Sequence, residues 1–246
     1  RVRRLFRRPY RGDLIKIATL YHDEPFLLTP NHEVLCGRKG ETGIQWKRAD
    51  QLTTRDFVLL PRMRVVKDLA TLHLADILPG CVTHDGAVRR AKVQRPLPDP
   101  VPVDGELLRL AGYYVAEGSI AAKGHSVQWS FSKAQEAYAD DVLNILKHLF
   151  GLVGRKYWIN NLCEVRVGSV LLADLMRAWF GRTASGKRLP DWMLYLPDRK
   201  LKELLKGFWR GDGNTDRTTF RFYTTSEVLA YQLRLVLTRL GLFSSL

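Results

Sequence analysis

Two acidic residues in this sequence share the same local setting. Glu117 and Asp212 are each followed by a glycine, and each has a glycine five residues earlier, at Gly112 and Gly207. A glycine inside a helix costs roughly 1 kcal/mol relative to alanine, so its repetition indicates that two helix backbones approach closely. Helices packed through these faces would bring both carboxylates to one end. Paired carboxylates in a basic protein suit hard divalent cations, and the alternative is an ordinary helix pair whose acids are solvated.

The surroundings of these acids form an internal repeat. Residues 106–118 (ELLRLAGYYVAEG) and 203–213 (ELLKGFWRGDG) both begin with Glu-Leu-Leu and a basic residue. Each is followed by an alternating stretch that predicts a strand and then by an amphipathic helix. The first copy adds a hairpin across Asn161-Leu162 and a third helix capped by Ser169, whereas the second copy stops after its second helix. Two copies of one helix–strand–strand–helix unit predict a pseudo-two-fold arrangement.

Composition narrows the function classes. The chain has 246 residues and a formal net charge of +14, and 46% of its residues are hydrophobic, enough for a folded core. The charge indicates a polyanionic partner, most simply nucleic acid, although a basic protein kept soluble by its charge is the alternative. No apolar run is long enough to span a membrane and no signal-peptide pattern opens the chain, so we expect an intracellular protein. Three cysteines far apart favour a reducing compartment.

The pattern of apolar residues, turn residues and prolines changes along the chain. Residues 1–62 alternate short apolar runs with turn residues, which is typical of an all-β domain. Residues 63–104 include QRPLPDPVPVDG, and its four prolines predict an extended linker or accessory region. Residues 105–246 alternate helices and strands, with a first repeat over 105–198 and a truncated second repeat over 199–246. The expected fold class is therefore α+β.

The repeated segments resemble the paired motifs of LAGLIDADG homing endonucleases of the DOD type, which occur inside inteins. LAGYYVAEG at 110–118 keeps Leu-Ala-Gly and the acid-Gly ending, with Glu117 where the family usually has aspartate. LKGFWRGDG at 205–213 keeps its two glycines and Asp212-Gly213, and GKRLPDWM at 186–193 is similar to the Lys-x-x-Pro block between the motifs. The resemblance implies a pseudo-two-fold monomer that cleaves double-stranded DNA at a specific site.

The same resemblance implies a set of catalytic residues. Glu117 and Asp212 would each bind Mg²⁺, with two or more ions between the protein and the scissile phosphates. The backbone carbonyls of Ala116 and Gly211 would complete the metal shells. Lys187 matches the family's basic residue near the attacking water, where it would steady developing charge, and its alternative is an ordinary surface lysine.

By the same resemblance, the sheet would be the DNA-reading surface. Its apolar side is expected to pack on helices and comprises Val127, Trp129, Phe131, Phe220 and Phe222. Strand ribbons fit the major groove, where Gln can read adenine and Arg can read guanine. The polar side presents Gln128, Ser130, Ser132, Arg166, Arg221 and Tyr223, and Lys133, Arg155 and Lys156 would neutralise phosphates. A merely solvated sheet face is the alternative for each of these residues.

The first 62 residues carry a second resemblance, to the amino-terminal part of a Hint splicing domain. RPYRGDLIKI, FLLTPNHEVLC and KRADQLTTRDFVLLPR are similar to its blocks, with Thr29 and His32 at its Thr-x-x-His. In that family the histidine assists the first acyl shift. The starting Cys or Ser and the closing His-Asn pair of the family are not in the sequence. We therefore expect a partial Hint domain whose ends are cut edges of a longer intein.

Two alternatives to an active intein nuclease remain open from the sequence. The shortened second copy would suit a catalytically degenerate DNA-binding fragment. The Hint-like segment would suit a splicing element in which the nuclease part is passenger sequence. A calcium loop is not supported, because DGNTD at 212–216 is followed by Arg217 instead of glycine, and no His-Glu-x-x-His spacing supports a zinc hydrolase.

Overall fold

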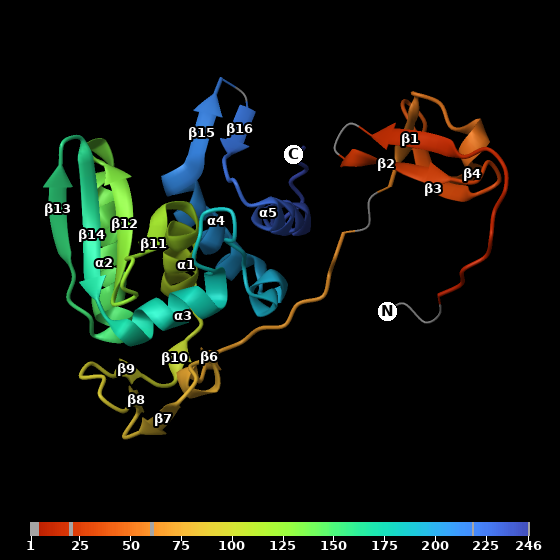
Figure 1. Cartoon of the computed structure of the whole chain (residues 1–246). Helices are drawn as coiled ribbons and strands as arrows, with labels where there is room; N and C mark the ends of the chain where they lie inside the picture. The colour runs from red at the N-terminus through yellow and green to blue at the C-terminus, as the bar shows by residue number, and fades with distance from the viewer. Residues whose placement is uncertain (1–4, 20–21, 60–61, 218, 246) are drawn as a thin grey trace. The chain divides into compact units, whose positions relative to one another are not determined.

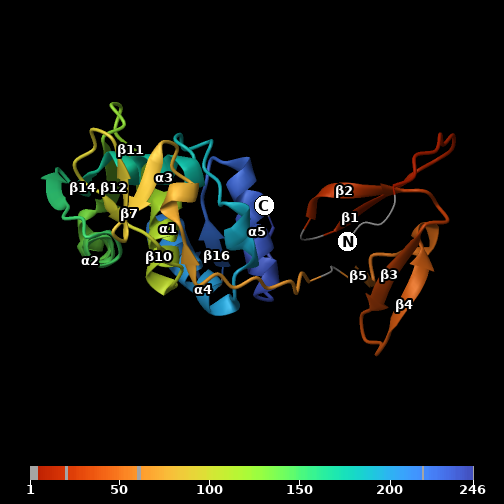
Figure 2. The same cartoon turned by 90° about the horizontal axis from the view of Figure 1, so that it is seen from below.

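The computed structural model describes residues 5–19, 22–59, 62–217 and 219–245. The chain forms two compact units, which Figure 1 shows in one view and Figure 2 from below. One unit contains the described residues up to Met63 together with those after Leu240, and the other is Arg64–Leu240. Each unit is described by itself below.

The first unit is built from short antiparallel strands, as its sequence predicts. Strand β1 pairs with β2, and β3 lies between β4 and β5. Its core is small, with Cys36 and Ala49 as its fully buried apolar side chains among the described residues. The elements are β1 (Ile15–Thr19), β2 (His22–Leu28), β3 (Glu33–Arg38), β4 (Ile44–Arg48), the 3-10 turn η1 (Ala49–Gln51) and β5 (Asp56–Val58).

The second unit is centred on a four-stranded antiparallel sheet with the order β11-β12-β14-β13. Its apolar face holds the buried side chains Trp129, Phe131 and Val165, against which three helices pack. These elements are α1 (Gly105–Glu117), β11 (Gly118–Ile120), β12 (Ser126–Ser132), the 3-10 turn η3 (Lys133–Gln135), α2 (Glu136–Phe150), β13 (Arg155–Ile159), β14 (Leu162–Gly168) and α3 (Val170–Phe180).

Local chemistry explains where the helices begin and end. The Ser169 hydroxyl accepts a hydrogen bond from the Leu172 amide and caps α3, which confirms the predicted cap. Gly151 adopts a left-handed conformation, with φ of 63°, and ends α2. The turn between β13 and β14 lies at Asn160-Asn161, one residue earlier than expected, and Asn160 takes the positive φ that the turn requires.

The second copy of the repeat is a smaller version of the first. Helix α4 leads into a two-stranded sheet, β15 with β16, and the chain then enters α5. Phe220 contacts Trp209 of α4, with the ring centres 5.5 Å apart, but it stays 72% exposed because the described sheet has only two strands. The elements are the 3-10 turn η4 (Asp191–Tyr195), α4 (Asp198–Asp212), β15 (Gly213–Asp216), β16 (Thr219–Phe222) and α5 (Glu227–Arg239).

The proline-rich stretch before α1 differs from the expected extended linker. Leu97, Val101 and Val103 are buried in the same core as the helices. Proline lacks a ladder donor but is accepted in short edge strands, so the apolar residues between the prolines can still pack inward. The elements here are β6 (Thr71–Leu72), the 3-10 turn η2 (Leu74–Asp76), β7 (Cys81–His84), β8 (Ala87–Arg90), β9 (Leu97–Pro98) and β10 (Val101–Pro102).

Helices α1 and α4 lie against each other through the predicted glycine faces. A Cβ added at Gly112 would stand 2.1 Å from the Leu204 carbonyl oxygen, and one at Gly207 would stand 2.1 Å from the Arg109 carbonyl oxygen. Leu204 and Arg109 are 95 positions apart, as are the two glycines, so the contacts are reciprocal. The Glu-Leu-Leu echo at 106 and 203 is offset by 97 positions, so these two stretches do not occupy equivalent places on the helices.

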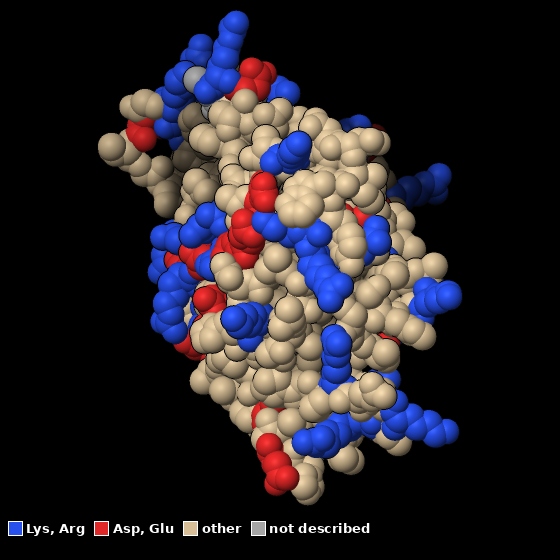
Figure 3. Space-filling view, turned by 90° about the vertical axis from the view of Figure 1, so that its left-hand side faces the viewer, with Lys and Arg blue, Asp and Glu red and all other residues tan. Residues whose placement is uncertain are grey.

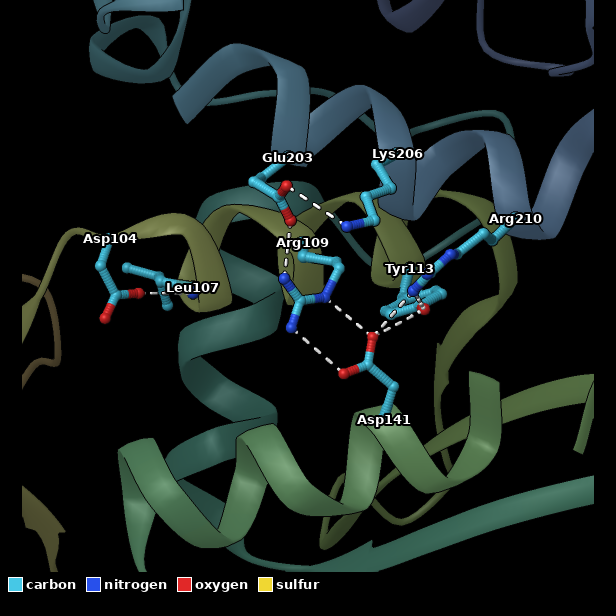
Figure 4. Close-up of polar contacts among 8 residues, drawn as sticks. All are labelled: Asp104, Leu107, Arg109, Tyr113, Asp141, Glu203, Lys206 and Arg210. Atoms are coloured by element: carbon cyan, nitrogen blue, oxygen red, sulfur yellow. Dashed lines mark hydrogen bonds and ion pairs between the residues drawn. The ribbon is translucent and has the colours of Figure 1, made fainter. Parts of the chain in front are cut away.

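A polar clamp reinforces this helix pair from α2, as Figure 4 shows. Asp141 of α2 accepts hydrogen bonds from Arg109 of α1 at 2.8 Å and from Arg210 of α4 at 3.0 Å. The Tyr113 hydroxyl also donates to Asp141, at 2.9 Å, and Arg109 donates to Glu203 at 2.6 Å. Burial opposes ionisation of Asp141, but the bonds from Arg109 and Tyr113 outweigh it and hold the Asp141 pKa below its usual value.

The close helix contact gives a stability prediction. We expect Gly207→Ala to lower the free energy of unfolding by about 3 kcal/mol, because its methyl group would overlap the α1 backbone. Gly168→Ala is the matched control, since a Cβ at Gly168 meets no atom within 4 Å. Urea unfolding measures both variants. Equal stability of the two would contradict the close packing.

Candidate active site

The two acids of the repeat meet at one end of the α1–α4 pair. Glu117 is the last residue of α1 and Asp212 the last of α4. A Cβ at Gly211 would lie 2.8 Å from Cγ of Glu117, so the two helix ends are in direct contact. The charge of Asp212 acts on Glu117, in agreement with this placement. The sequence prediction that the two acids would come together is confirmed.

Each acid is followed by glycine for a steric reason. A Cβ at Gly118 would lie 2.3 Å from the Tyr114 ring, and one at Gly213 would lie 2.5 Å from the Trp209 ring. Both glycines have negative φ, −78° and −90°, so the requirement is space and not a left-handed backbone. The chain turns tightly over an aromatic residue four positions back, and this turn directs each helix into the strand that follows it.

Lys187 joins the two acids from the loop that follows α3. Its side chain is buried, and its Nζ donates to the Ala116 carbonyl oxygen at 3.1 Å and lies 5.7 Å from the centre of the Tyr114 ring. Its backbone carbonyl accepts a hydrogen bond of 2.5 Å from the Ser226 hydroxyl, which caps α5. Lys187 is therefore held by both repeats and is not a surface lysine.

Burial and mutual repulsion shape the electrostatics of this cluster. Burial and the Asp212 charge raise the pKa of Glu117 to about 7, although Lys187 opposes the shift. Burial also raises the pKa of Asp212. Burial lowers the pKa of Lys187 to about 8, against the pull of the two carboxylates. The pair of acids thus carries an excess of negative charge that a bound cation would relieve.

The donor set fits a hard divalent cation that keeps part of its own hydration. Two carboxylates converge, and within the described ranges no third His, Cys, Asp or Glu joins them. Mg²⁺ and Mn²⁺ bind through few carboxylates and leave positions for water or phosphate oxygens. The carbonyl of Gly211 lies at the same helix end, whereas the carbonyl of Ala116 already accepts the Lys187 hydrogen bond.

A depression of about 590 Å³ opens beside Glu117 on the outward side of the sheet. Ser130, Ser132 and the Asn160-Asn161 turn line it together with Gln135. The Gln135 side chain accepts from the Ser132 amide at 3.0 Å and donates to the Arg210 carbonyl at 3.2 Å, so it joins the sheet to α4. Gln135 was not predicted from the sequence; the Ser-x-x-Gln capping box at 132–135 was the available signal.

The structure separates the predicted DNA-contacting residues into groups. On β12, Gln128 and Ser130 alternate with buried apolar residues and Ser132 is exposed, so all three lie on the outward face. Arg166 lies opposite Gln128 on β14, pairs with Glu164 at 2.6 Å and packs 4.8 Å from the centre of the Tyr157 ring. Lys133 is exposed just after β12.

The remaining predicted contacts lie elsewhere in the second unit. Lys156 points to the helix side, where it pairs with Glu136 and Asp140 of α2 at 2.6 and 2.7 Å. It was expected at phosphates, but its strand position is opposite Val165, whose side chain is in the core. Arg221 and Tyr223 are exposed at the second hairpin, and Arg221 lies 3.5 Å from Asp216.

Thr29 and His32 belong to the first unit. They bracket a turn in which the His32 amide donates to the Thr29 carbonyl at 2.9 Å. The His32 side chain is exposed, and its backbone carbonyl accepts from the Ala49 amide at 2.8 Å. The splicing role expected for this pair stays a prediction.

Comparison with known protein families finds a match, which lies mainly in the second unit. Residues 104–171 and 200–246 match the family model of the LAGLIDADG-like domain. This part of the chain is therefore similar to a LAGLIDADG-like domain. No helix among the described residues has the length and apolar character to cross a membrane.

Several curated proteins are similar to this chain. It is 28% identical to an uncharacterized protein of Methanocaldococcus jannaschii, a match that covers 98% of this chain and 33% of that protein. It is 29% identical to an iron-sulfur cluster assembly SufBD family protein of Mycobacterium tuberculosis, over 91% of this chain and 25% of that protein. It is 31% identical to the DNA polymerase II large subunit of Thermococcus kodakarensis, over 55% of this chain and 8% of that protein. The chain thus spans a third or less of each of these relatives.

Among solved structures, I-DmoI in complex with DNA and Mn is 14% identical to this chain. The match covers 56% of this chain and 79% of that one, with a TM-score of 0.42.

The strained acid pair gives a second prediction. Because the pKa of Glu117 is raised in the folded state, the fold loses stability as the pH rises from the ordinary value of 4.5 to about 7. Without divalent cations at pH 8, we expect Glu117→Gln to raise the free energy of unfolding by about 1 kcal/mol, with no gain near pH 4.5. Glu227→Gln, an exposed acid at the start of α5, should change it by at most a few tenths. Thermal unfolding of Glu117→Gln at both pH values would refute the strain if it showed no gain at pH 8.

Proposed function

We propose that this chain carries a site-specific, divalent-metal-dependent endonuclease for double-stranded DNA that forms part of an intein. The observation that carries the nuclease proposal is the convergence of Glu117, Asp212 and buried Lys187 where two equivalent helices end. The LAGLIDADG-like domain, the net charge of +14 and the polar outward sheet face support it. Mg²⁺ is the proposed cofactor, and Mn²⁺ would satisfy the same donors.

Each residue of the cluster has a role in phosphodiester hydrolysis. Glu117 and Asp212 would hold the metal against the scissile phosphate, with the Gly211 carbonyl as a further ligand. Metal ions bound there would supply an activated water and stabilise the leaving oxygen. Lys187 remains positively charged below its pKa of about 8 and would place that charge beside the phosphate, where negative charge develops.

The sheet would hold the DNA in register with this cluster. Gln128 and Arg166 lie side by side on neighbouring strands and present the side chains that read adenine and guanine in the major groove. Ser130 and Ser132 line the depression beside Glu117, so DNA on this face would reach the acids directly. We propose that the chain acts as a monomer whose two repeats address the two halves of one target.

The intein context rests on separate observations. The curated relatives have unrelated names, an iron-sulfur cluster assembly protein and a DNA polymerase subunit among them, and the matched segment is a minor part of each. A segment that recurs inside unrelated proteins is what an inserted element produces. The first unit, which is all-β and contains Thr29 and His32, supports the proposal that a Hint-like splicing domain precedes the nuclease part.

A cleavage assay tests the nuclease proposal. With Mg²⁺, the chain should linearise a plasmid that carries the host gene without the insert. Glu117→Gln and Asp212→Asn should each lower the cleavage rate at least 10³-fold, because each removes a metal ligand. Asp198→Asn changes an exposed acid at the other end of α4 and should leave the rate unchanged. Cutting retained by both ligand variants would contradict the metal roles.

Lys187→Met gives a separate prediction. We expect the cleavage rate to fall about 100-fold while the affinity for the DNA changes less than threefold, because the lysine acts on the developing charge. Single-turnover cleavage and DNA binding in Ca²⁺ measure the two quantities. A matching loss of both would assign Lys187 to binding alone.

A degenerate DNA-binding module is the second candidate. The observation in its favour is the second repeat, whose described sheet has two strands, β15 and β16, where the first has four. Such a module would bind the plasmid but leave it uncut with Mg²⁺ or Mn²⁺.

The intein context has its own test: His32→Ala in the longer parent protein should reduce excision of the insert, as measured by mass spectrometry. Asn31→Ala is the control.

A further inference from the structure

A second basic site lies at the β13 edge of the sheet, away from the paired acids. It is a pocket of about 640 Å³ formed where the segment before α1 meets the four-stranded sheet. Arg95 comes from the loop between β8 and β9, Arg155 from β13 and Arg166 from β14. Of the described residues that line the pocket, none is Asp or Glu.

The guanidinium groups differ in how far they are already satisfied. Arg166 is paired with Glu164 at 2.6 Å and is the least available. Arg95 donates from Nη1 to the Gly168 carbonyl at 3.2 Å, which fixes its loop to the end of β14 and leaves its other N–H groups free of described partners. Arg155 is exposed and forms no ion pair with any residue in the described part of the chain. The pocket therefore has positive charge on Arg95 and Arg155 that no described acidic residue neutralises and that an anion could bind.

The register of the sheet connects this pocket to the proposed DNA face. Ser119 pairs with Gln128, Gln128 with Arg166, and Arg166 with Arg155, so one row of outward side chains crosses all four strands. With strands about 4.8 Å apart, the row is roughly 14 Å long. It begins beside α1 and ends in the pocket. Figure 3 looks onto the β13 side of the molecule, where basic side chains are widely spread and acidic ones gather in smaller groups.

We propose that the loop carrying Arg95 belongs to the DNA interface and that this pocket binds the DNA phosphate backbone beyond the base pairs read by the sheet. The inference rests on the proposed function, because the row of side chains that leads to the pocket is the proposed reading face. Guanidinium groups bind phosphate oxygens in a bidentate manner, and Tyr157 forms an aromatic wall of the pocket. The segment before α1 thus contacts the DNA backbone through Arg95 and also contributes apolar residues to the core.

The test is duplex-DNA binding by the full chain in Ca²⁺ at several salt concentrations. Arg95→Ala and Arg155→Ala should each weaken binding roughly tenfold, and each should reduce the salt slope of log K by about one. Arg89→Ala removes an exposed arginine of the same segment outside the pocket and should change neither quantity. Circular dichroism and melting temperature establish that the variants remain folded.

The outcomes separate this inference from the proposed function. Binding and salt slope unchanged in both pocket variants, with DNA cleavage intact, would overturn the pocket proposal alone. Binding of inorganic phosphate and of a nucleotide is measured in the same variants. If Arg95→Ala and Arg155→Ala weaken the binding of these small anions but leave duplex-DNA binding unchanged, the pocket is a small-anion site and the pocket proposal is overturned. A wild-type chain that does not bind duplex DNA would overturn both proposals. Equal effects of Arg89→Ala would show general charge loss and also overturn the pocket.

Discussion

The contact between the backbones of α1 and α4 is the constraint on which the rest of this structure depends. Gly112 and Gly207 permit it, because any side chain at either position would overlap the facing helix. The close approach brings the two helix ends together, and so holds Glu117 and Asp212 near each other. It also means that the fold cannot relax the repulsion between the acids by moving one helix away.

The molecule resists that repulsion with two polar devices. At the acid end, buried Lys187 supplies one positive charge beside the carboxylates. Asp141 links Arg109 to Arg210, which lies in the last turn of α4, and so ties both helices to α2. The pKa of Glu117 stays raised in spite of Lys187, so the charge is only partly offset. A site of this kind is strained for the free protein and complementary to a divalent cation, a common trade of stability for function.

The sequence predicts the helices, the acid pair and the outward strand residues because these depend on local periodicity and on repetition. The clamp through Asp141 could not be predicted, since it joins residues that are far apart in the sequence. Lys156 was misplaced because β13 has two basic residues followed by two aromatic ones, so each face of the strand carries one of each kind. The prolines concealed the alternation of Leu97, Val101 and Val103, and a linker was expected where the chain contributes to the core.

The central claim is that Glu117 and Asp212 form one divalent-cation site. Calorimetric titration of the full chain with Mn²⁺ tests it most directly, with Glu117→Gln/Asp212→Asn as the comparison. The account predicts saturable binding to the wild type with a rise in melting temperature, and neither effect in the double variant. Undiminished Mn²⁺ binding by the folded double variant would contradict it.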